Sequence, residues 1–201
     1  QKERTFPSAV QVSLGVDMDF SDQPDYVSRS FEMEEPIKVG NSETTLLHFK
    51  QYSFDPTLAP SGKTVVEVIY MFSDFDYWKD LVKDRKAYKA EKERILTATL
   101  EALEEQFPGI SAKVEASDVA TPMTYQRYAG TWNGTFMTWL PTPDNSSYIR
   151  MIPNQLPDIE KLYFAGMWLM PPGGLPTGVK TSRDIIQQIC KAEKQKFSVA
   201  M

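Results

Sequence analysis

Apolar and polar residues alternate along two early stretches of the chain, and a third consists mostly of apolar residues; both patterns are typical of β-strands. The stretches are residues 8–16, 44–52 and 63–72. The third is rich in β-branched and aromatic side chains, which favour strands. The segment between the second and third contains Pro56, Pro60 and Gly62. Because these residues shape a reversing connection, we predict that the two strands pair antiparallel.

The segment between the first two strands has a different composition. Residues 17–42 are rich in Asp, Ser, Pro and Glu, and Gly40-Asn41 forms a break near the end. Clusters of these residue types are typical of loops. We therefore predict a loop here, with room for one short strand.

Helical spacing begins in the middle of the chain. Residues 80–94 are highly charged, and apolar positions then recur at three- and four-residue intervals until Pro108-Gly109 ends the pattern. We predict one long helix over residues 80–107. The neighbouring charges Glu91, Lys92, Glu93 and Arg94 have both signs, which indicates a solvated helix face rather than a binding surface.

The rest of the chain predicts shorter elements. We expect a strand over residues 111–119, a helix beginning at Pro122, a short apolar strand over 161–165, a loop over 171–178, and a last helix marked by apolar residues from 179 to 190. Residues 131–148 are rich in aromatic side chains but have no clear period. The fold class that these elements predict is α+β.

The composition of the chain excludes some classes of function. The chain of 201 residues is 41% hydrophobic and 24% charged, as in globular proteins. A net charge of −5 without a basic cluster argues against nucleic-acid binding. The single cysteine, Cys190, suits a reducing, cytoplasmic compartment. The single histidine, His48, lies in a predicted strand without a G-x-S-x-G elbow or zinc ligands. We interpret it as structural and expect no metal.

The segment of residues 162–178 holds the strongest candidate chemistry. It reads as strand, glycine turn, glycine-proline loop and helix. Gly166 and the pair Gly173-Gly174 let the backbone approach a flat group, because no Cβ intervenes. Pro176 suits a first helical turn, whose free N–H groups favour negative charge. Spacing alone leaves two interpretations open, a cofactor loop or an ordinary connection whose glycines ease packing.

The same segment resembles a known family. The run Leu162-Tyr-Phe-Ala-Gly166, then Pro171-Pro-Gly-Gly-Leu-Pro176, then Ser182-Arg183 is similar to the C-terminal flavin motif of the phytoene desaturase and retinol saturase family. Further similar stretches follow the family's order, at residues 8–17, 55–62, 75–78 with 88–89, 107–109 and 120–128. The resemblance thus covers nearly the whole chain.

The resemblance implies an FAD-dependent oxidoreductase acting by hydride transfer on carotenoid-like or retinoid-like substrates. Residues 1–157 would form part of a substrate-binding domain, an antiparallel sheet with flanking helices. Residues 158–201 would supply the last strand and helix of a Rossmann-like FAD domain. The residues implied to contact FAD are Gly166, Met167, Gly173, Gly174, Leu175, Pro176 and Thr177. Those implied to contact a lipid-like polyene are Tyr125, Arg127, Trp132, Phe136 and Trp139.

The chain departs from the family pattern in two places. Met167 stands where many flavin oxidoreductases have an acidic residue that helps to hold the cofactor, so its side chain cannot make that contact. The Gly-x-Gly-x-x-Gly fingerprint that binds the FAD pyrophosphate is absent from this sequence. We therefore expect a C-terminal fragment without turnover and with weak flavin affinity at most.

Two other functions stay open. One is a different flavoenzyme of the amine oxidase superfamily, against which the stretches 55–60 and 121–125 argue. The other is a non-catalytic lipid-binding or interaction module derived from the substrate domain. A polyene substrate partitions into lipid, so peripheral membrane contact is compatible with the sequence. Self-association of an isolated fragment, through a surface normally covered, is compatible as well.

Overall fold

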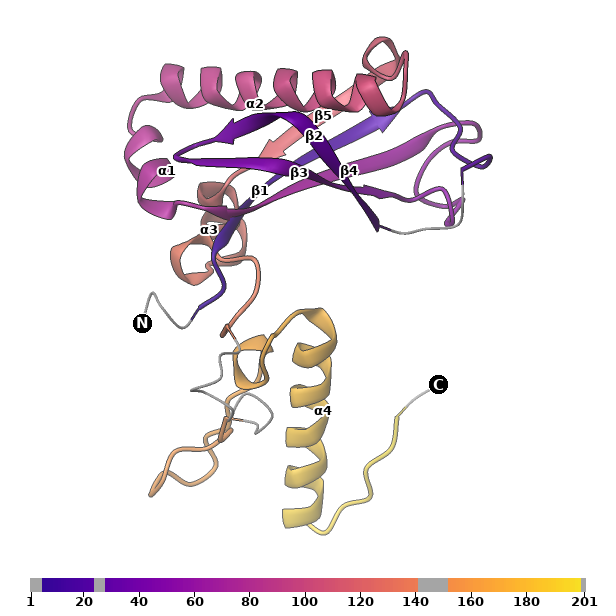
Figure 1. Ribbon diagram of the computed structural model, residues 1–201. Coiled ribbons are helices and arrows are strands. Elements are labelled where there is room, and N and C mark those ends of the chain that lie inside the picture. Colours follow the sequence, from indigo (N-terminus) through magenta and orange to yellow (C-terminus); the bar gives the residue numbers. More distant parts are fainter. Residues whose placement is uncertain (1–4, 24–27, 141–151, 200–201) are drawn as a thin grey trace. The chain divides into compact units, whose positions relative to one another are not determined.

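The computed structural model describes residues 5–23, 28–140 and 152–199 (Figure 1). The chain divides into two compact units. Residues Pro7–Phe136 form one, here called the sheet unit, and residues Gln1–Phe6 with Met137–Met201 form the other, here called the terminal unit. The assignment of residues 1–157 and 158–201 to two domains stays a prediction.

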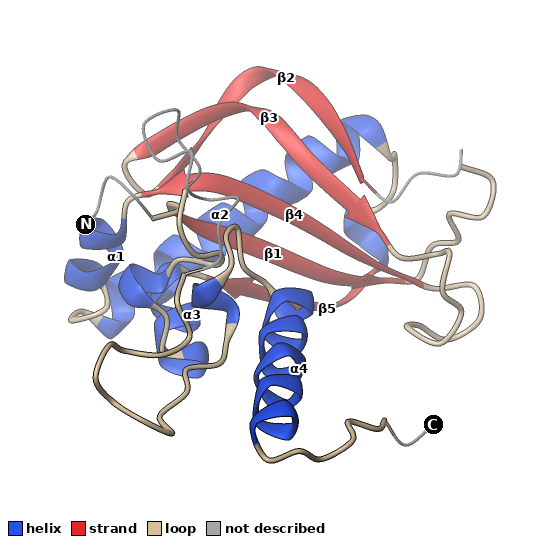
Figure 2. Cartoon of the chain, turned by 90° about the horizontal axis from the view of Figure 1, so that it is seen from below, coloured by secondary structure: helices blue, strands red, loops and turns tan. Residues whose placement is uncertain are grey.

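The sheet unit is built on an antiparallel sheet of five strands in the order β2-β3-β4-β1-β5 (Figure 2). The strands are β1 Ser8–Val16, β2 Ser28–Val39, β3 Ser42–Gln51, β4 Thr64–Ser73 and β5 Val114–Ala120. All four neighbouring pairs are antiparallel, which confirms the predicted pairing of β3 with β4. β4 therefore lies in the centre of the sheet.

Strand β2 corrects the prediction of a loop over residues 17–42. It buries Phe31, Met33, Ile37 and Val39 between exposed polar residues. The register shifts between Glu32 and Ile37, and the intervening Pro36 lies at this irregularity of an edge strand, where a missing N–H is tolerated. The acidic residues and the proline made this segment resemble a loop, although its apolar residues alternate with polar ones and are buried in the folded protein.

Two helices replace the predicted single helix over residues 80–107. They are α1 Phe75–Leu81 and α2 Arg85–Gln106. The Asp74 carboxylate accepts a hydrogen bond from the backbone N–H of Asp76, and the Asp84 carboxylate accepts from the N–H groups of Lys86 and Ala87. An aspartate whose side chain accepts hydrogen bonds from the first backbone N–H groups of a helix is an N-cap and marks where that helix begins. Asp84 therefore begins a second helix, and residues 82–84 separate α1 from α2.

The core of the sheet unit lies between α2 and one face of the sheet (Figure 1). The Phe49 ring contacts those of Phe20, Phe31 and Phe107 at centroid distances of 4.9–6.0 Å. The Tyr70 hydroxyl of β4 is 2.7 Å from Thr99 Oγ1 of α2, and both residues are buried. The face of the sheet that carries Tyr70 is therefore the covered one.

After β5 the chain forms α3 Pro122–Ala129, which confirms the predicted helix start at Pro122. Thr121 and Thr124 form a reciprocal capping box, and Gly130 ends the helix in the left-handed conformation with φ 63°. The predicted strand over 111–119 begins three residues later, because the 3₁₀ helix η2 Ser111–Lys113 precedes it. A further 3₁₀ helix, η3 Trp132–Gly134, follows α3.

The terminal unit contains the 3₁₀ helix η5 Met167–Leu169 and the helix α4 Leu175–Ala192, which confirms the last predicted helix. The predicted strand over residues 161–165 does not form. Phe164 N–H donates to the Asn154 carbonyl at 2.8 Å, but no ladder extends from this contact within the described residues. A strand needs a partner backbone along its length, and the apolar sequence alone does not supply one.

The overall class is α+β, as predicted. Among the helices of residues 5–23, 28–140 and 152–199, none combines the length and the apolar character that a membrane crossing requires.

Candidate functional site

An open hollow lies where α4 begins, here called the glycine hollow. It has a volume of about 700 Å³ and is lined by Ala165, Gly166, Met167, Gly174, Leu175, Gly178, Val179 and Ser182. The lining is mainly apolar and contains three glycines. Four of the residues predicted to contact FAD therefore meet here, namely Gly166, Met167, Gly174 and Leu175.

Local backbone chemistry explains this arrangement. Gly166 has φ 134° and Gly174, the residue before α4, has φ 96°, both in a region that residues with a Cβ rarely adopt. The buried Thr181 Oγ1 accepts a hydrogen bond from Gly166 N–H at 3.1 Å and lies 3.2 Å from the Gly166 carbonyl oxygen. Thr181 thus fixes the Gly166 backbone against α4.

The glycines have different roles. A Cβ built on Gly173 would lie 2.5 Å from Thr138 Cγ2, so Gly173 is needed for packing inside the terminal unit. A Cβ on Gly166 would meet nothing within 4 Å, and Cβ atoms on Gly174 and Gly178 would have neighbours only at 3.8 and 3.9 Å. These three glycines therefore add no Cβ to the lining of the glycine hollow, so a ligand can approach their backbone closely.

Pro176 and Thr177 shape the helix start rather than the hollow. Pro176 occupies the first helical turn, and Thr177 Oγ1 donates to the Gly174 carbonyl at 2.7 Å. No acidic residue lies in this turn and no side chain caps it. Because the first N–H groups of a helix have no partner inside the helix, this end carries partial positive charge.

The glycine hollow suits one kind of occupant. Its apolar walls and Cβ-free floor fit the face of a planar ring system, and the positive helix end beside it fits a ring edge that carries negative charge. An isoalloxazine ring has both properties. The residues present therefore fit a flavin on geometric and electrostatic grounds.

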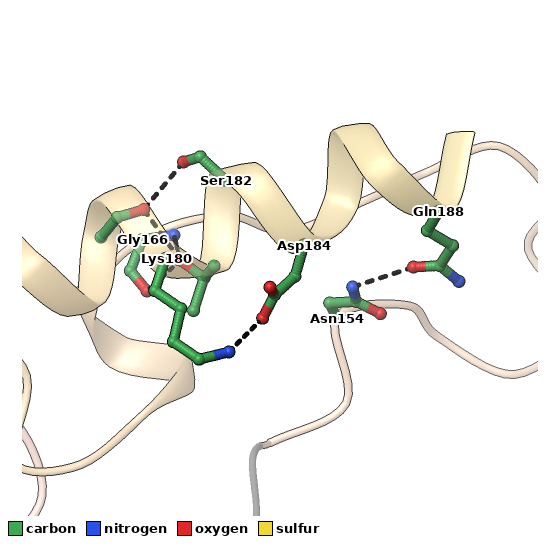
Figure 3. Close-up of polar contacts among 8 residues, drawn as sticks. Asn154, Gly166, Lys180, Ser182, Asp184 and Gln188 are labelled. Carbon is green, nitrogen blue, oxygen red and sulfur yellow. Dashed lines mark hydrogen bonds and ion pairs between the residues drawn. The ribbon is translucent and has the colours of Figure 1, made fainter. Parts of the chain in front are cut away.

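One kind of polar contact joins α4 to the segment around Asn154, and another kind links residues within the helix (Figure 3). Asn154 Nδ2 donates to Gln188 Oε1 at 3.1 Å, and Lys180 Nζ lies 2.5 Å from Asp184 Oδ2 one turn away. Ser182 Oγ donates to the Gly178 carbonyl at 2.9 Å. The Ser182 hydroxyl hydrogen at the rim of the hollow is therefore already used.

The residues predicted to contact substrate lie in both units. Tyr125, Arg127, Trp132 and Phe136 belong to the sheet unit, and Trp139 belongs to the terminal unit. The Trp139 ring packs edge-on against Trp168 at 5.2 Å, and its Nε1 donates to the Trp168 carbonyl. Within the terminal unit Trp139 thus has a packing role, and its contact with substrate stays a prediction.

The side chains of Arg127 and Tyr125, both on α3, have different neighbours. Arg127 lines a cleft of about 410 Å³ beside α2, together with Lys92, Asp118 and Tyr128. Its guanidinium carbon lies 5.4 Å from the centre of the Tyr128 ring. Tyr125 instead donates its hydroxyl hydrogen to Gln11 Oε1 at 3.1 Å, on the sheet.

The Tyr125 contact leads to a network that the sequence pattern did not reveal. Gln11 Nε2 donates to Glu67 Oε1 at 2.8 Å, and the Tyr52 hydroxyl donates to Glu67 Oε2 at 2.7 Å. Burial raises the pKa of Tyr52 to about 12, with a further rise from Glu67. Burial likewise raises the pKa of Tyr125 to about 12, helped by the negative charges of Glu67 and Asp118. Both hydroxyls therefore remain protonated donors.

The sequence signal for this network is a single carboxylate in an apolar strand. Glu67 interrupts the run Thr64-Val-Val-Glu-Val-Ile-Tyr-Met-Phe72. Its partners are far away in sequence, since Gln11 is 56 residues distant. Only the strand register brings them together.

Comparison with known proteins agrees with this geometry. The family model of flavin containing amine oxidoreductases matches residues 2–186. The chloroplastic prolycopene isomerase of Arabidopsis thaliana is 32% identical over 83 residues, covering 41% of this chain and 13% of that protein. The prolycopene isomerase of Daucus carota is 28% identical over 139 residues, covering 65% of this chain and 21% of that protein. The all-trans-retinol 13,14-reductase of Danio rerio is 31% identical over 137 residues, covering 65% and 23%.

The chain therefore belongs to the flavin containing amine oxidoreductase family. Its similarity to a prolycopene isomerase and to a retinol reductase confirms the resemblance to the phytoene desaturase and retinol saturase type. The chain spans 13–23% of the length of these relatives.

Proposed function

We propose that this chain is the C-terminal portion of an FAD-dependent oxidoreductase that acts on a carotenoid-like or retinoid-like polyene. The terminal unit would contribute the last elements of a Rossmann-like FAD domain, and most of the residues up to 157 would form the substrate-binding domain. The observation that carries the proposal is the glycine hollow at the start of α4, whose floor, walls and helix end fit a flavin ring. The family match supports the same cofactor.

The roles of the chain's own residues follow from this geometry. Gly166, Gly174 and Gly178 would allow the close approach of the ring, and Met167, Leu175 and Val179 would exclude water from its face. The helix end would favour negative charge on the ring. When bound, the flavin would supply the hydride chemistry, which explains why this function needs no acid–base pair in the terminal unit.

A substitution at Gly166 tests the proposal. The protein expressed from its complete coding sequence would be compared with Gly166→Ala, which adds a Cβ at φ 134° in the hollow. Gly62→Ala is the matched control, because Gly62 also has positive φ, 78°, and nothing lies within 4 Å of its Cβ position. Gly166 has φ 134° and ψ 175°, a conformation that only glycine readily adopts, so its Cβ costs about 1–3 kcal/mol, and Gly62→Ala reports the effect of a Cβ at positive φ outside the hollow.

We expect Gly166→Ala to lower the bound flavin per polypeptide several-fold, measured by absorbance after gel filtration, while Gly62→Ala retains it. Circular dichroism melting would show that both variants fold. Equal flavin content in Gly166→Ala and the unaltered protein would contradict the proposal. For the 201-residue chain alone we expect no turnover and weak flavin affinity at most, and a stoichiometric yellow complex after purification would contradict the expected weak affinity.

A second candidate function is a lipid-binding module without catalysis. The observation that favours it is the apolar character of β4 on both faces of the sheet, since Val65, Ile69 and Met71 are directed away from the core. A polyene that binds to the complete protein without reducing or requiring flavin would support this alternative.

A further inference from the structure

Thr138, in the terminal unit, buries a hydroxyl group that has no hydrogen-bonding partner. Its side chain is fully buried, and the part of the chain that the structure describes offers no partner to Thr138 Oγ1. A buried hydroxyl without a partner disfavours the folded state, because it has given up its hydrogen bond to water. Valine has nearly the same shape and would avoid this penalty. The hydroxyl therefore points to a second state of the protein in which it is paired.

The backbone of Thr138 is fixed on both sides within the terminal unit. Its N–H donates to the Pro172 carbonyl at 3.0 Å, and its carbonyl accepts from Phe6 N–H at 2.8 Å. The next residue, Trp139, forms a β-bridge with Thr5. Because these contacts hold Thr138 in place, the partner of its hydroxyl must be a neighbouring group that can move.

The neighbouring group belongs to the loop before α4. A Cβ on Gly173 would lie 2.8 Å from Thr138 Oγ1, so only glycine leaves room here. Gly173 has φ 94° and Gly174 has φ 96°. The peptide group between two glycines can rotate with little steric resistance, because neither residue carries a Cβ. Gly174 also lines the glycine hollow, so this peptide group joins the neighbour of Thr138 to the site proposed for flavin.

A rotation of this peptide group moves its two polar ends in opposite directions. In a planar trans peptide, the carbonyl oxygen and the N–H point away from each other. When Gly174 N–H is directed into the glycine hollow, the Gly173 carbonyl is therefore directed away from the hollow. Thr138 is buried next to Gly173 and outside the lining of the hollow, where it can donate to that carbonyl. An N–H directed into the hollow favours negative charge there, which a reduced flavin carries on its ring.

We propose that Thr138 is a positioning residue that couples the peptide group between Gly173 and Gly174 to the charge of the flavin. With negative charge in the hollow, the peptide group turns its N–H toward the ring, and its carbonyl accepts the Thr138 hydroxyl hydrogen. Thr138 then stabilises the orientation that suits reduced flavin and raises the reduction potential. This inference rests on the proposed function and adds a way in which the chain regulates that same site.

The variant Thr138→Val, made in the protein expressed from its complete coding sequence, tests the inference, because it removes the hydroxyl and keeps the shape. Without flavin, its melting temperature by circular dichroism should rise by about 2–4 °C, since the unpaired hydroxyl is gone. With flavin, a reductive titration against dyes of known potential should show about tenfold weaker binding of reduced relative to oxidised flavin. For a two-electron couple, this tenfold change lowers the reduction potential by about 30 mV.

Two further variants separate the hydrogen bond from packing. Thr138→Ser keeps the hydroxyl but loses a methyl group, so it should lower the melting temperature and retain the reduction potential. Thr99→Val removes a buried hydroxyl that is already paired with Tyr70 and with the Ile95 carbonyl. It should lower the melting temperature without changing the reduction potential. A crystal structure of the reduced protein should show the Gly173 carbonyl oxygen about 2.7 Å from Thr138 Oγ1.

Two results would overturn the inference. The first is an unchanged or lower melting temperature of Thr138→Val without flavin, because the hydroxyl would then already be paired in that state. The second is a reduction potential that Thr138→Val leaves unchanged or that Thr138→Ser lowers equally. Either result, in a protein that binds flavin, leaves the proposed function intact. If the unaltered complete protein binds no flavin, the proposed function fails, and this inference fails with it.

Discussion

The two units of this protein distribute their apolar residues in opposite ways. The continuous hydrophobic core belongs to the sheet unit, from Val10 to Val119. In the described residues of the terminal unit, the buried hydrophobic side chains are those of Leu169 and Ile185, while Leu175 is 84% and Val179 64% exposed. The sheet unit is stabilised by burial, whereas the terminal unit depends on backbone and polar contacts.

The exposed apolar residues of α4 are ordered. Leu175, Val179 and Ile186 recur at helical spacing on one face, and Thr181 and Ile185 are buried on another. A helix with an exposed apolar stripe is typical of an element that a ligand or further protein covers. The comparison therefore separates a region that folds around its own core from one that keeps an apolar stripe exposed.

The largest expected effect lies in the core of the sheet unit. Phe49→Ala would remove a ring that contacts three other phenylalanines and is fully buried. Large-to-small changes of this kind cost about 3–5 kcal/mol in the free energy of unfolding. Urea unfolding followed by circular dichroism would measure the loss.

Val179→Ala in α4 is the matched control, because its side chain is exposed, and it should change the free energy of unfolding by less than about 0.5 kcal/mol. If Val179→Ala proves as costly as Phe49→Ala, the terminal unit has a core of its own and the comparison is wrong.

The second effect is a loss of stability of the sheet unit at high pH. Burial raises the pKa of Tyr70 to about 12 from an ordinary value of 10.0, although its contact with Thr99 lowers it somewhat. A raised folded-state pKa stabilises the fold fully below pH 10. That contribution is lost between about pH 10 and 12, because the unfolded chain ionises first.

The pKa shift of about two units at Tyr70 corresponds to about 2–3 kcal/mol. Urea midpoints from pH 8 to 12 would follow the decline. Tyr70→Phe removes the ionisable group, so the free energy of unfolding should depend less steeply on pH. The slope that remains would come from Tyr52 and Tyr125, whose pKa values are also raised. An unchanged slope in Tyr70→Phe would refute the assignment.

These contrasts also show what the sequence could predict. Alternation revealed β1 and β3 because their apolar residues face the core at a two-residue period, whereas β4 was revealed by its β-branched and aromatic residues. It failed at β2, whose charged outer face and Pro36 resembled a loop. It failed at residues 82–84 as well, because apolar spacing does not show that Asp84 caps a new helix. The short strand at 161–165 failed for a third reason, since a strand requires partners that local sequence does not encode.

The candidate site divides in the same way. The glycine loop could be found from residue types, but the separate roles of Gly173 and Gly166 depend on the position of Thr138. The network around Glu67 depends on the register of β1 against β4. A sequence pattern can reveal a residue whose role depends on its own backbone conformation. It cannot reveal a residue whose role depends on partners that are far away in the sequence.

The third effect concerns the terminal unit. Thr181→Val keeps the side-chain shape but removes the hydroxyl that pairs with the Gly166 N–H, leaving a partly buried donor without a partner. The expected cost is about 1–2 kcal/mol. Hydrogen exchange of the Gly166 amide and of α4 should accelerate accordingly, while β4 amides remain protected.

Ser182→Ala is the control for Thr181→Val, since the Ser182 hydroxyl is exposed and donates to the Gly178 carbonyl inside the same helix. It should accelerate exchange little. Equal acceleration in both variants would show that the hydroxyl of Thr181 has no special role in fixing Gly166.

The smallest effect is expected at the ion pair between Lys180 and Asp184, whose charged atoms lie 2.5 Å apart on the surface of α4. Exposed pairs at this spacing contribute about 0.3–0.5 kcal/mol and weaken with salt. Lys180→Ala should therefore accelerate α4 exchange about twofold at low salt and not measurably in 1 M salt. A larger, salt-independent effect would mean that the lysine methylenes pack against the terminal unit, and polar contacts would then not suffice to explain how this region is held.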